Sequence, residues 1–206
     1  MKIGPRFKIA KRLGAPIFEK TQTRQFQLSQ ARAEKAASRK KTGKRGGSDF
    51  KRQLTEVQKV RFGYGITESQ LSRYIKAATE KKGAMPAATL LASLESRLDN
   101  VIYRIGLVDT RRAARQMVSH GHITINGRRV TVPSLSVTPG MKIAVREGSK
   151  GSVLFQNLTE RLAEKKTPAW ISFDIGTLSG EMKTVPTTDS VDLIGDFGAV
   201  LEFYSR

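Results

Sequence analysis

An apolar stripe in the middle of the chain constrains the fold more than any other sequence feature. Between residues 86 and 106, aliphatic side chains recur three and four positions apart, which places them on one face of a helix. They are Leu90, Leu91, Leu94, Leu98, Val101, Ile102 and Ile105. We expect this face to be buried, with Pro86 in the first helical turn and Gly106 at the C-terminal end. Because about 20 residues is long for one globular helix, a break is predicted near Ser93.

A second, shorter helix is predicted directly after the stripe. Thr110 is a suitable N-cap for it, and Gly121 is a suitable end. The helical spacing predicts that its apolar positions face inward and that its arginines face outward. The inward positions are Ala113, Ala114, Met117 and Val118, and the outward positions are Arg111, Arg112 and Arg115. Such a helix presents one face to a core and a cationic face to solvent.

Alternating apolar residues on both sides of Asn126 and Gly127 predict a β-hairpin, because Asn-Gly favours a two-residue turn. Further predicted elements are strands over 142–145, 170–175 and 182–185 and a helix over 156–166. The expected fold class is therefore α+β. It combines a helical N-terminal domain with a small domain of two helices and an antiparallel β-sheet.

The front of the chain is predicted to be helical from Ser48 onward. Ser48 can cap a helix over 49–62, which Gly63 and Gly65 would end. Thr67 then opens a capping box at the start of the next helix.

Residues 1–47 are basic and contain few large aliphatic side chains. The stretch RAEKAASRKKTGKRGG within them has almost nothing to bury, so we expect it to order only against a partner. The signals in the last residues of the chain are mixed. The predicted organisation is a basic extension over 1–47, a helical domain over 48–93 completed by 190–206, and a module with an antiparallel sheet over 94–189.

Charge indicates the class of partner. The chain has 37 Lys and Arg against 18 Asp and Glu, a formal net charge of +19. Residues 1–90 carry a net +16, whereas residues 147–206 carry a net −3. A cationic surplus of this size favours a polyanion, usually a nucleic acid. A membrane surface is the lesser alternative, because lipidation signals and a long apolar run are missing. We expect no secretory signal, no homo-oligomer and a cytoplasmic location.

Several chemistries are excluded by residue types. The sequence has no cysteine, which excludes disulfides, Cys-ligated metals and a thiol nucleophile. Its only histidines, His120 and His122, flank a glycine at a helix end. Contacts with backbone carbonyls or RNA phosphate are favoured there over metal binding. No nucleotide-binding glycine loop and no nucleophile elbow occurs. We expect no metal, no cofactor and no enzymatic activity.

One tripeptide in the stripe, Arg97-Leu98-Asp99, resembles the Arg-Leu-Asp of pseudouridine synthases, whose aspartate is catalytic. That aspartate lies in a glycine-flanked loop, whereas Asp99 lies within the strongest helical pattern of this chain. We therefore interpret Asp99 as an ion-pair partner of Arg97 or Arg104.

The segment from Leu94 to Val130 combines features that suit RNA. The capped helix presents arginines near its N-terminal turn, where free N–H groups and the helix dipole favour a phosphate. The hairpin adds Arg128 and Arg129, and guanidinium groups bind phosphates with planar, forked donors. The set of five arginines therefore predicts an RNA-binding surface.

This segment resembles the RNA-binding module named after small-subunit ribosomal protein number four. The resemblance extends over nearly the whole chain, through GPRFKIAKRLG, DFKRQLTEVQKVRFGYGITESQLSRYIKAA and PAWISFDIG to VLEFYSR. The chain is identified as a member of the bacterial-type family of that ribosomal protein. Two other interpretations remain: a free-standing RNA-binding regulator, and an RNA-modifying enzyme that uses the same module.

The resemblance implies a primary binder of the 5′ domain of small-subunit rRNA. Such a protein nucleates assembly of the subunit body and contributes to translational accuracy. It also implies three neighbours: ribosomal proteins three and five of the small subunit, and messenger RNA where it enters the subunit. Some relatives carry a zinc-binding cysteine cluster, which this sequence lacks, so no zinc is carried over.

Charge and resemblance together predict two sets of site residues. The RNA-binding set is Arg6, Lys8, Lys11, Arg12, Lys44, Arg45, Lys51, Arg52, Lys59, Arg61, Arg73, Arg111, Arg112, Arg115, His120, Arg128 and Arg129. The protein-contact set is Asp189, Asp192 and Asp196 in the acidic tail.

Overall fold

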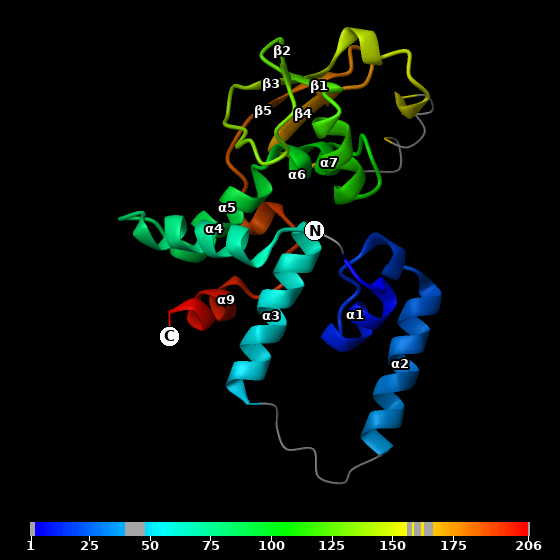
Figure 1. Cartoon of the computed structure of the whole chain (residues 1–206), viewed down its shortest axis with the longest axis vertical. Helices are drawn as coiled ribbons and strands as arrows, with labels where there is room; N and C mark the ends of the chain where they lie inside the picture. Colours follow the sequence, from blue (N-terminus) through cyan, green and yellow to red (C-terminus); the bar gives the residue numbers. More distant parts are fainter. Residues whose placement is uncertain (1–2, 40–47, 156–157, 159–161, 163–166, 206) are drawn as a thin grey trace. The chain divides into compact units, whose positions relative to one another are not determined.

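The computed structural model describes residues 3–39, 48–155, 158, 162 and 167–205. The chain divides into two compact units (Figure 1). The first unit comprises residues 1–87 and 193–206, and the second comprises residues 88–192. Helices make up the first unit, and the second combines helices with a five-stranded antiparallel sheet. The predicted α+β class is confirmed.

The first unit begins with three elements, and the sequence pattern did not predict that they form a core of their own. They are α1 (Arg6–Leu13), the 3-10 turn η1 (Glu19–Thr21) and α2 (Arg24–Arg39). Three widely spaced apolar residues, Ala10, Phe18 and Phe26, form a buried cluster, and Phe62 packs against it. Sparse aromatic side chains thus supply a small core that the sequence pattern did not predict. The expectation that the basic stretch over 32–47 orders only against a partner stays a prediction, and residues 40–47 lie outside the described residues.

The rest of the first unit is built on α3 (Asp49–Tyr64) and α4 (Glu68–Glu80). The predicted caps are confirmed: Ser48 accepts a hydrogen bond from the Lys51 backbone, and Thr67 forms a capping box with Gln70. The C-terminal residues, whose signals were mixed, form helix α9 (Phe197–Tyr204), which packs against α3 and α4 (Figure 1).

Gly63 does not end α3 as predicted. The helix continues through Gly63 to Tyr64 and ends at Gly65, whose φ of +65° is left-handed. A Cβ on Gly63 would collide with Cγ2 of Ile194. The glycine is therefore required for close packing between helix and C-terminal segment, not for a turn.

The predicted long helix is two helices, α5 (Pro86–Glu95) and α6 (Leu98–Ile105), with the break at Ser96 and Arg97 rather than near Ser93. Arg97 is extended, with φ −65° and ψ 137°. The backbone of Ser96 accepts from Val137 N at 2.8 Å, and Leu98 N donates to Leu135 O at 2.8 Å. The break lies at Ser96 and Arg97 because the backbone there is hydrogen-bonded to the loop that contains Leu135 and Val137. Helix length alone suggested a different position.

The sheet of the second unit has the order β2-β1-β3-β5-β4, and all its pairs are antiparallel. Asn126 and Gly127 have positive φ values of 49° and 78°, which confirms the predicted hairpin turn. The strands are β1 (Ile123–Ile125), β2 (Arg128–Val130), β3 (Lys142–Val145), β4 (Ile171–Asp174) and β5 (Ser179–Met182).

One predicted strand is shorter than expected, and one predicted helix is described at two residues only. The strand expected over 182–185 ends at Met182, because its partner β4 begins at Ile171, which is paired with Met182. Most of the helix expected over 156–166 lies outside the described residues; Leu158 and Leu162 are helical and buried. Short 3-10 turns cover Glu147–Ser149, Val153–Phe155 and Thr188–Ser190.

One apolar core joins α6, helix α7 (Arg111–Ser119) and the sheet. Leu98, Ile102 and Ile105 contribute from α6 and are completely buried. Ala114, Met117 and Val118 form the inner face of α7, as the spacing predicted. Each large side chain buried in this way contributes about 1.5–3 kcal/mol. The core thus fixes the outer face of α7. Over the described part of the chain, no helix has the length and apolarity needed to cross a bilayer.

Candidate nucleic-acid interface

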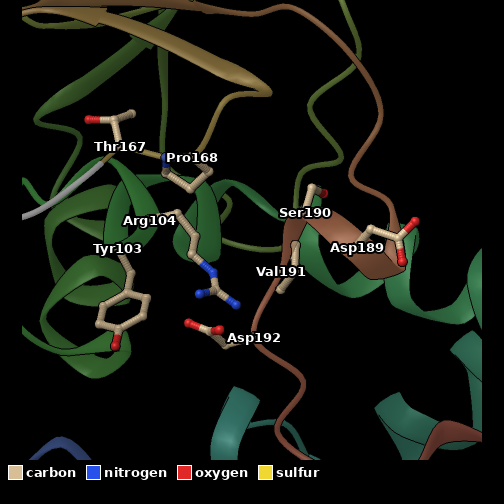
Figure 2. Close-up of a pocket in the computed structure, with 8 residues that line it drawn as sticks. All are labelled: Tyr103, Arg104, Thr167, Pro168, Asp189, Ser190, Val191 and Asp192. Atoms are coloured by element: carbon tan, nitrogen blue, oxygen red, sulfur yellow. The ribbon is translucent and has the colours of Figure 1, made fainter.

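Two of the three acidic residues predicted to contact proteins line one cavity of the second unit, of about 390 Å³. Asp189 and Asp192 are exposed there, and Arg104 extends into the cavity toward Asp192 (Figure 2). Asp196 belongs to the first unit and has a local role. Its carboxylate accepts hydrogen bonds from the backbone N–H groups of Gly198 and Ala199, so it caps α9.

The arginines of α7 are not equivalent. All three lie outside the buried face of the helix, but Arg112 is exposed, whereas Arg111 and Arg115 are half-buried. The side chains of the latter two turn toward polar groups at the start of α6. Thr110 caps the helix by accepting from Ala113 N at 3.1 Å. The arginines differ in exposure because different groups lie beneath each guanidinium.

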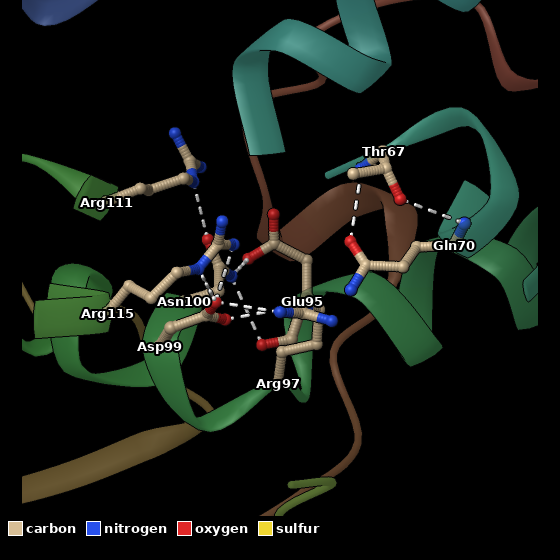
Figure 3. A network of polar contacts seen from close by, with 8 residues as sticks. All are labelled: Thr67, Gln70, Glu95, Arg97, Asp99, Asn100, Arg111 and Arg115. Carbon is tan, nitrogen blue, oxygen red and sulfur yellow. Dashed lines mark hydrogen bonds and ion pairs between the residues drawn. The ribbon is translucent and has the colours of Figure 1, made fainter. Parts of the chain in front are cut away.

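Asp99 lies beneath Arg115 and is 3% exposed. Its Oδ2 accepts hydrogen bonds from Arg115 Nε at 3.0 Å and Nη2 at 2.8 Å (Figure 3). Arg97, itself buried, donates to both Asp99 oxygens, at 3.0 and 2.8 Å. The predicted pair with Arg97 is confirmed. The pair with Arg104 is wrong, because Arg104 binds Glu95.

A second buried carboxylate, that of Glu95, accepts hydrogen bonds from other polar side chains of the site. It accepts from Arg104 Nε and Nη2 at 2.9 and 2.8 Å, and from Asn100 Nδ2 at 2.6 Å. The Asn100 Oδ1 in turn accepts from Arg111 Nε at 2.7 Å (Figure 3). The Arg111 guanidinium also lies 4.3 Å from the centroid of the Tyr103 ring. The hydrogen bond to Asn100 and the cation–π contact with Tyr103 therefore fix Arg111.

These contacts argue against a catalytic Asp99. A nucleophilic aspartate must reach a substrate, whereas the Asp99 carboxylate is buried and occupied by two guanidinium groups. The sequence pattern did not predict that Glu95 and Asn100 belong to the same polar network. The only signal was their position on both sides of the helix break, which brings the ends of α5 and α6 together.

The arginines of the hairpin also differ from one another. Arg128 is exposed on β2. Arg129 folds back onto the end of α7 and donates to the His120 carbonyl at 3.2 Å. Gly121, with φ +73°, lies beneath it, and a Cβ there would collide with the Arg129 guanidinium. The hairpin is thereby tied to the helix that carries the other arginines.

The two histidines lie side by side at this end of the module, with ring centroids 6.1 Å apart. His120 is exposed. His122 is half-buried, and its Nδ1 lies 3.0 Å from Oγ of the buried Ser149. Burial lowers the pKa of His122 below 6.5, and the nearby His120 and Arg146 act in the same direction. His122 therefore favours its neutral form in a strongly cationic neighbourhood.

The predicted RNA-binding residues of the first unit are mostly exposed, and several have local partners. Arg12 donates to Gln58, Lys59 pairs with Glu56 at 2.6 Å, and Arg61 pairs with Glu68 at 2.7 Å. Arg6 and Lys59 are half-buried, as is Arg61. The exposed members of the set are Lys8, Lys11, Arg12, Lys51, Arg52 and Arg73. Lys44 and Arg45 lie outside the described residues.

Within the described ranges, no group of three His, Cys, Asp or Glu side chains could hold a metal ion. The arginines described above give the site an electrostatic chemistry. Fixed guanidinium groups, an exposed Arg112 and the arginines of the hairpin present hydrogen-bond donors to an anion, with geometry that suits phosphate.

Comparisons with known proteins cover the full chain. Residues 1–95 match the family described as ribosomal protein S4/S9 N-terminal domain, and residues 96–143 match the S4 domain. The chain is 41% identical to small ribosomal subunit protein uS4 of Acinetobacter baumannii over 206 residues, covering 99% of this chain and 98% of the relative.

Two further relatives have the same name. The protein of Acinetobacter baylyi is 39% identical over 204 residues, covering 99% of this chain and 98% of its own. The protein of Acetivibrio thermocellus is 45% identical over 159 residues, covering 77% of this chain and 76% of its own. The matches extend over both units and include the helices and hairpin that carry the arginines. The chain belongs to the family of small ribosomal subunit protein uS4.

Proposed function

We propose that this chain is a primary binder of small-subunit rRNA, and that its binding to the 5′ domain nucleates assembly of the subunit body. As a member of the uS4 family, it is a structural, non-enzymatic constituent of the small ribosomal subunit that binds rRNA.

The observation that carries the proposal is the fixed arginine surface of α7. Its inner face is anchored in an apolar core, and two of its arginines, Arg111 and Arg115, are held by Asn100 and Asp99 of the same unit. A surface ordered by its own unit needs no other protein to form. An early binder requires this property, because it must meet rRNA before neighbouring proteins arrive.

The net +16 of residues 1–90 supports the same proposal from the other unit. Exposed lysines and arginines of α1 and α3 add phosphate contacts whose strength depends on salt. We place messenger RNA and ribosomal proteins three and five among the further neighbours. A contribution to translational accuracy would act through the acidic residues Asp189 and Asp192, which suit a cationic protein surface.

Binding of the full chain to a transcript of the 5′ domain tests the proposal. We expect affinity at least tenfold higher than for an unrelated structured RNA of equal length, because base and shape contacts add to the phosphate contacts. Equal affinity for both RNAs contradicts the proposal. Preference for the chain's own messenger over the 5′ domain would favour a free-standing regulator instead.

The protein contact is tested separately with Asp192→Asn. This change removes one exposed charge and leaves the fold intact, so we expect rRNA affinity to remain unchanged and association with protein five to weaken. Asp196→Asn is the matched control for stability, because asparagine caps a helix as well as aspartate. Unchanged protein association and unchanged accuracy in assembled subunits would contradict this part.

A further inference from the structure

We propose that Asp99 is a positioning residue for RNA binding. It holds the guanidinium of Arg115 in place before RNA arrives, so its removal weakens RNA binding even though a negative charge is removed. The inference rests on the proposed function, because it requires that α7 faces RNA. In the tripeptide Arg97-Leu98-Asp99, Asp99 thereby has a role in RNA binding in addition to its ion pairs.

The contacts of Asp99 define the position of Arg115. Two donors of one guanidinium, Nε and Nη2, meet the same Asp99 oxygen at 3.0 and 2.8 Å. The carboxylate is itself fixed, because buried Arg97 binds both of its oxygens. Asp99 therefore cannot follow a moving Arg115, and the guanidinium is held against a rigid acceptor. About a third of the Arg115 side chain, 31%, remains exposed.

The same arrangement is repeated one turn earlier on α7. Arg111 is held by Asn100, and Asn100 is fixed by the completely buried Glu95. Arg111 and Arg115 thus each have an acceptor that is itself anchored. Ordering a long side chain on binding costs about 0.5–1.5 kcal/mol, which corresponds to about two- to tenfold in affinity, and an arginine held in advance avoids that cost.

Charge alone predicts the opposite change in RNA affinity when Asp99 is replaced. The network contains two carboxylates and four guanidinium groups, so it remains cationic. Replacing Asp99 by a neutral residue makes it more cationic, and simple attraction to phosphates would then increase. Positioning predicts a decrease. The two explanations are separated by the direction of the change.

The experiment compares Asp99→Asn with Glu147→Gln in the full chain, using the 5′-domain transcript as the probe. Glu147 is the matched control, because it is an acidic residue of the same unit that pairs only at the surface with Lys150. We expect Asp99→Asn to weaken binding about two- to tenfold. Glu147→Gln should leave binding unchanged or slightly stronger. Equal or tighter binding by Asp99→Asn overturns the inference.

A double-mutant cycle identifies the arginine through which Asp99 acts. In a background of Arg115→Gln, the further change Asp99→Asn should have no additional effect on RNA affinity. The same weakening with and without Arg115 would overturn the inference. Arg112→Gln separates this failure from failure of the proposed function. If Arg112→Gln also binds with parental affinity, α7 does not face RNA; if it weakens binding, only the positioning role fails.

A variant that avoids the buried residue keeps the test decisive if Asp99→Asn does not fold. Arg115→Lys and Arg112→Lys both retain the charge, but lysine cannot form the paired contact with Asp99. Circular dichroism on the same samples establishes that both are folded. We expect Arg115→Lys to weaken RNA binding more than Arg112→Lys. Equal effects would overturn the inference, because position 115 would then contribute charge only.

Discussion

The two units present their cations to solvent in different ways. In the second unit, Arg111 and Arg115 are held by Asn100 and Asp99, so their guanidinium groups have fixed places. In the first unit, Lys8 and other exposed cations lie on helix surfaces, and the ion pairs described there are mostly short-range and partly exposed. From this comparison we infer a division of labour in RNA binding, in which the first unit contributes charge density and the second contributes fixed geometry.

The largest expected effect is on stability and comes from reversing the charge of Arg115. Arg115→Glu places a carboxylate beside buried Asp99 and removes one of its two partners, so unfolding should become easier by about 3–5 kcal/mol. Arg112→Glu is the control, because Arg112 is exposed, and it should change stability by less than about 0.5 kcal/mol. Urea unfolding measures both. Similar stabilities for the two variants would remove the distinction between held and exposed arginines.

The stability of the first unit should be most sensitive to substitutions at positions where its helices pack closely. Gly63→Ala introduces a Cβ that collides with Ile194, and we expect a decrease of about 1–3 kcal/mol in the free energy of unfolding. Gly4→Ala is the matched control, because a Cβ there meets nothing within 4 Å. If Gly63→Ala were as stable as Gly4→Ala, the C-terminal segment would not pack on α3 as described.

The salt dependence of RNA binding distinguishes the units directly. Replacing Lys8 and Lys11 by Gln removes two exposed charges, which should reduce the log–log salt slope by about 0.7–0.9 for each phosphate that is no longer neutralised. Affinity should fall equally for the 5′ domain and for an unrelated RNA. Arg112→Gln should reduce the preference between the two RNAs as well. If the lysine changes reduced the preference for the 5′ domain over the unrelated RNA, the division of labour would be contradicted.

The smallest expected effect concerns pH. The pKa of His122 is lowered in the folded chain, chiefly by burial, so the folded state binds fewer protons than the unfolded state when the pH falls below 6.5. Stability should therefore be constant above this value and decrease as the pH is lowered through and below it. His122→Gln should remove this part of the dependence. Equal pH dependence of parent and variant between about pH 7 and pH 5 would contradict the assignment.

The sequence predicted best those features that depend on neighbouring residues. Caps at Ser48, Thr67 and Thr110, and the turn at Asn126 and Gly127, follow from local backbone geometry and are present. Burial of the apolar stripe follows from its helical spacing, and its members are buried.

Features that depend on distant residues were not predictable in the same way. The place of the helix break is set by a loop around Leu135, and the role of Gly63 is set by Ile194. The partial burial of Arg115 was not predicted, because it is set by an acceptor on another helix, Asp99. A helical pattern reveals which face is polar, but not which polar partner lies beneath it.

The central claim is that arginines of α7 are ordered before RNA binds, and NMR of the guanidinium Nε–H groups in the free protein tests it most directly. We predict that Arg115 Nε–H exchanges slowly with water in the free chain, that Arg112 Nε–H exchanges rapidly, and that addition of the 5′-domain transcript leaves Arg115 nearly unchanged. If the Arg115 Nε–H exchanged as rapidly as that of Arg112 and became protected only with RNA, the ordering would be a result of binding and the central claim would be wrong.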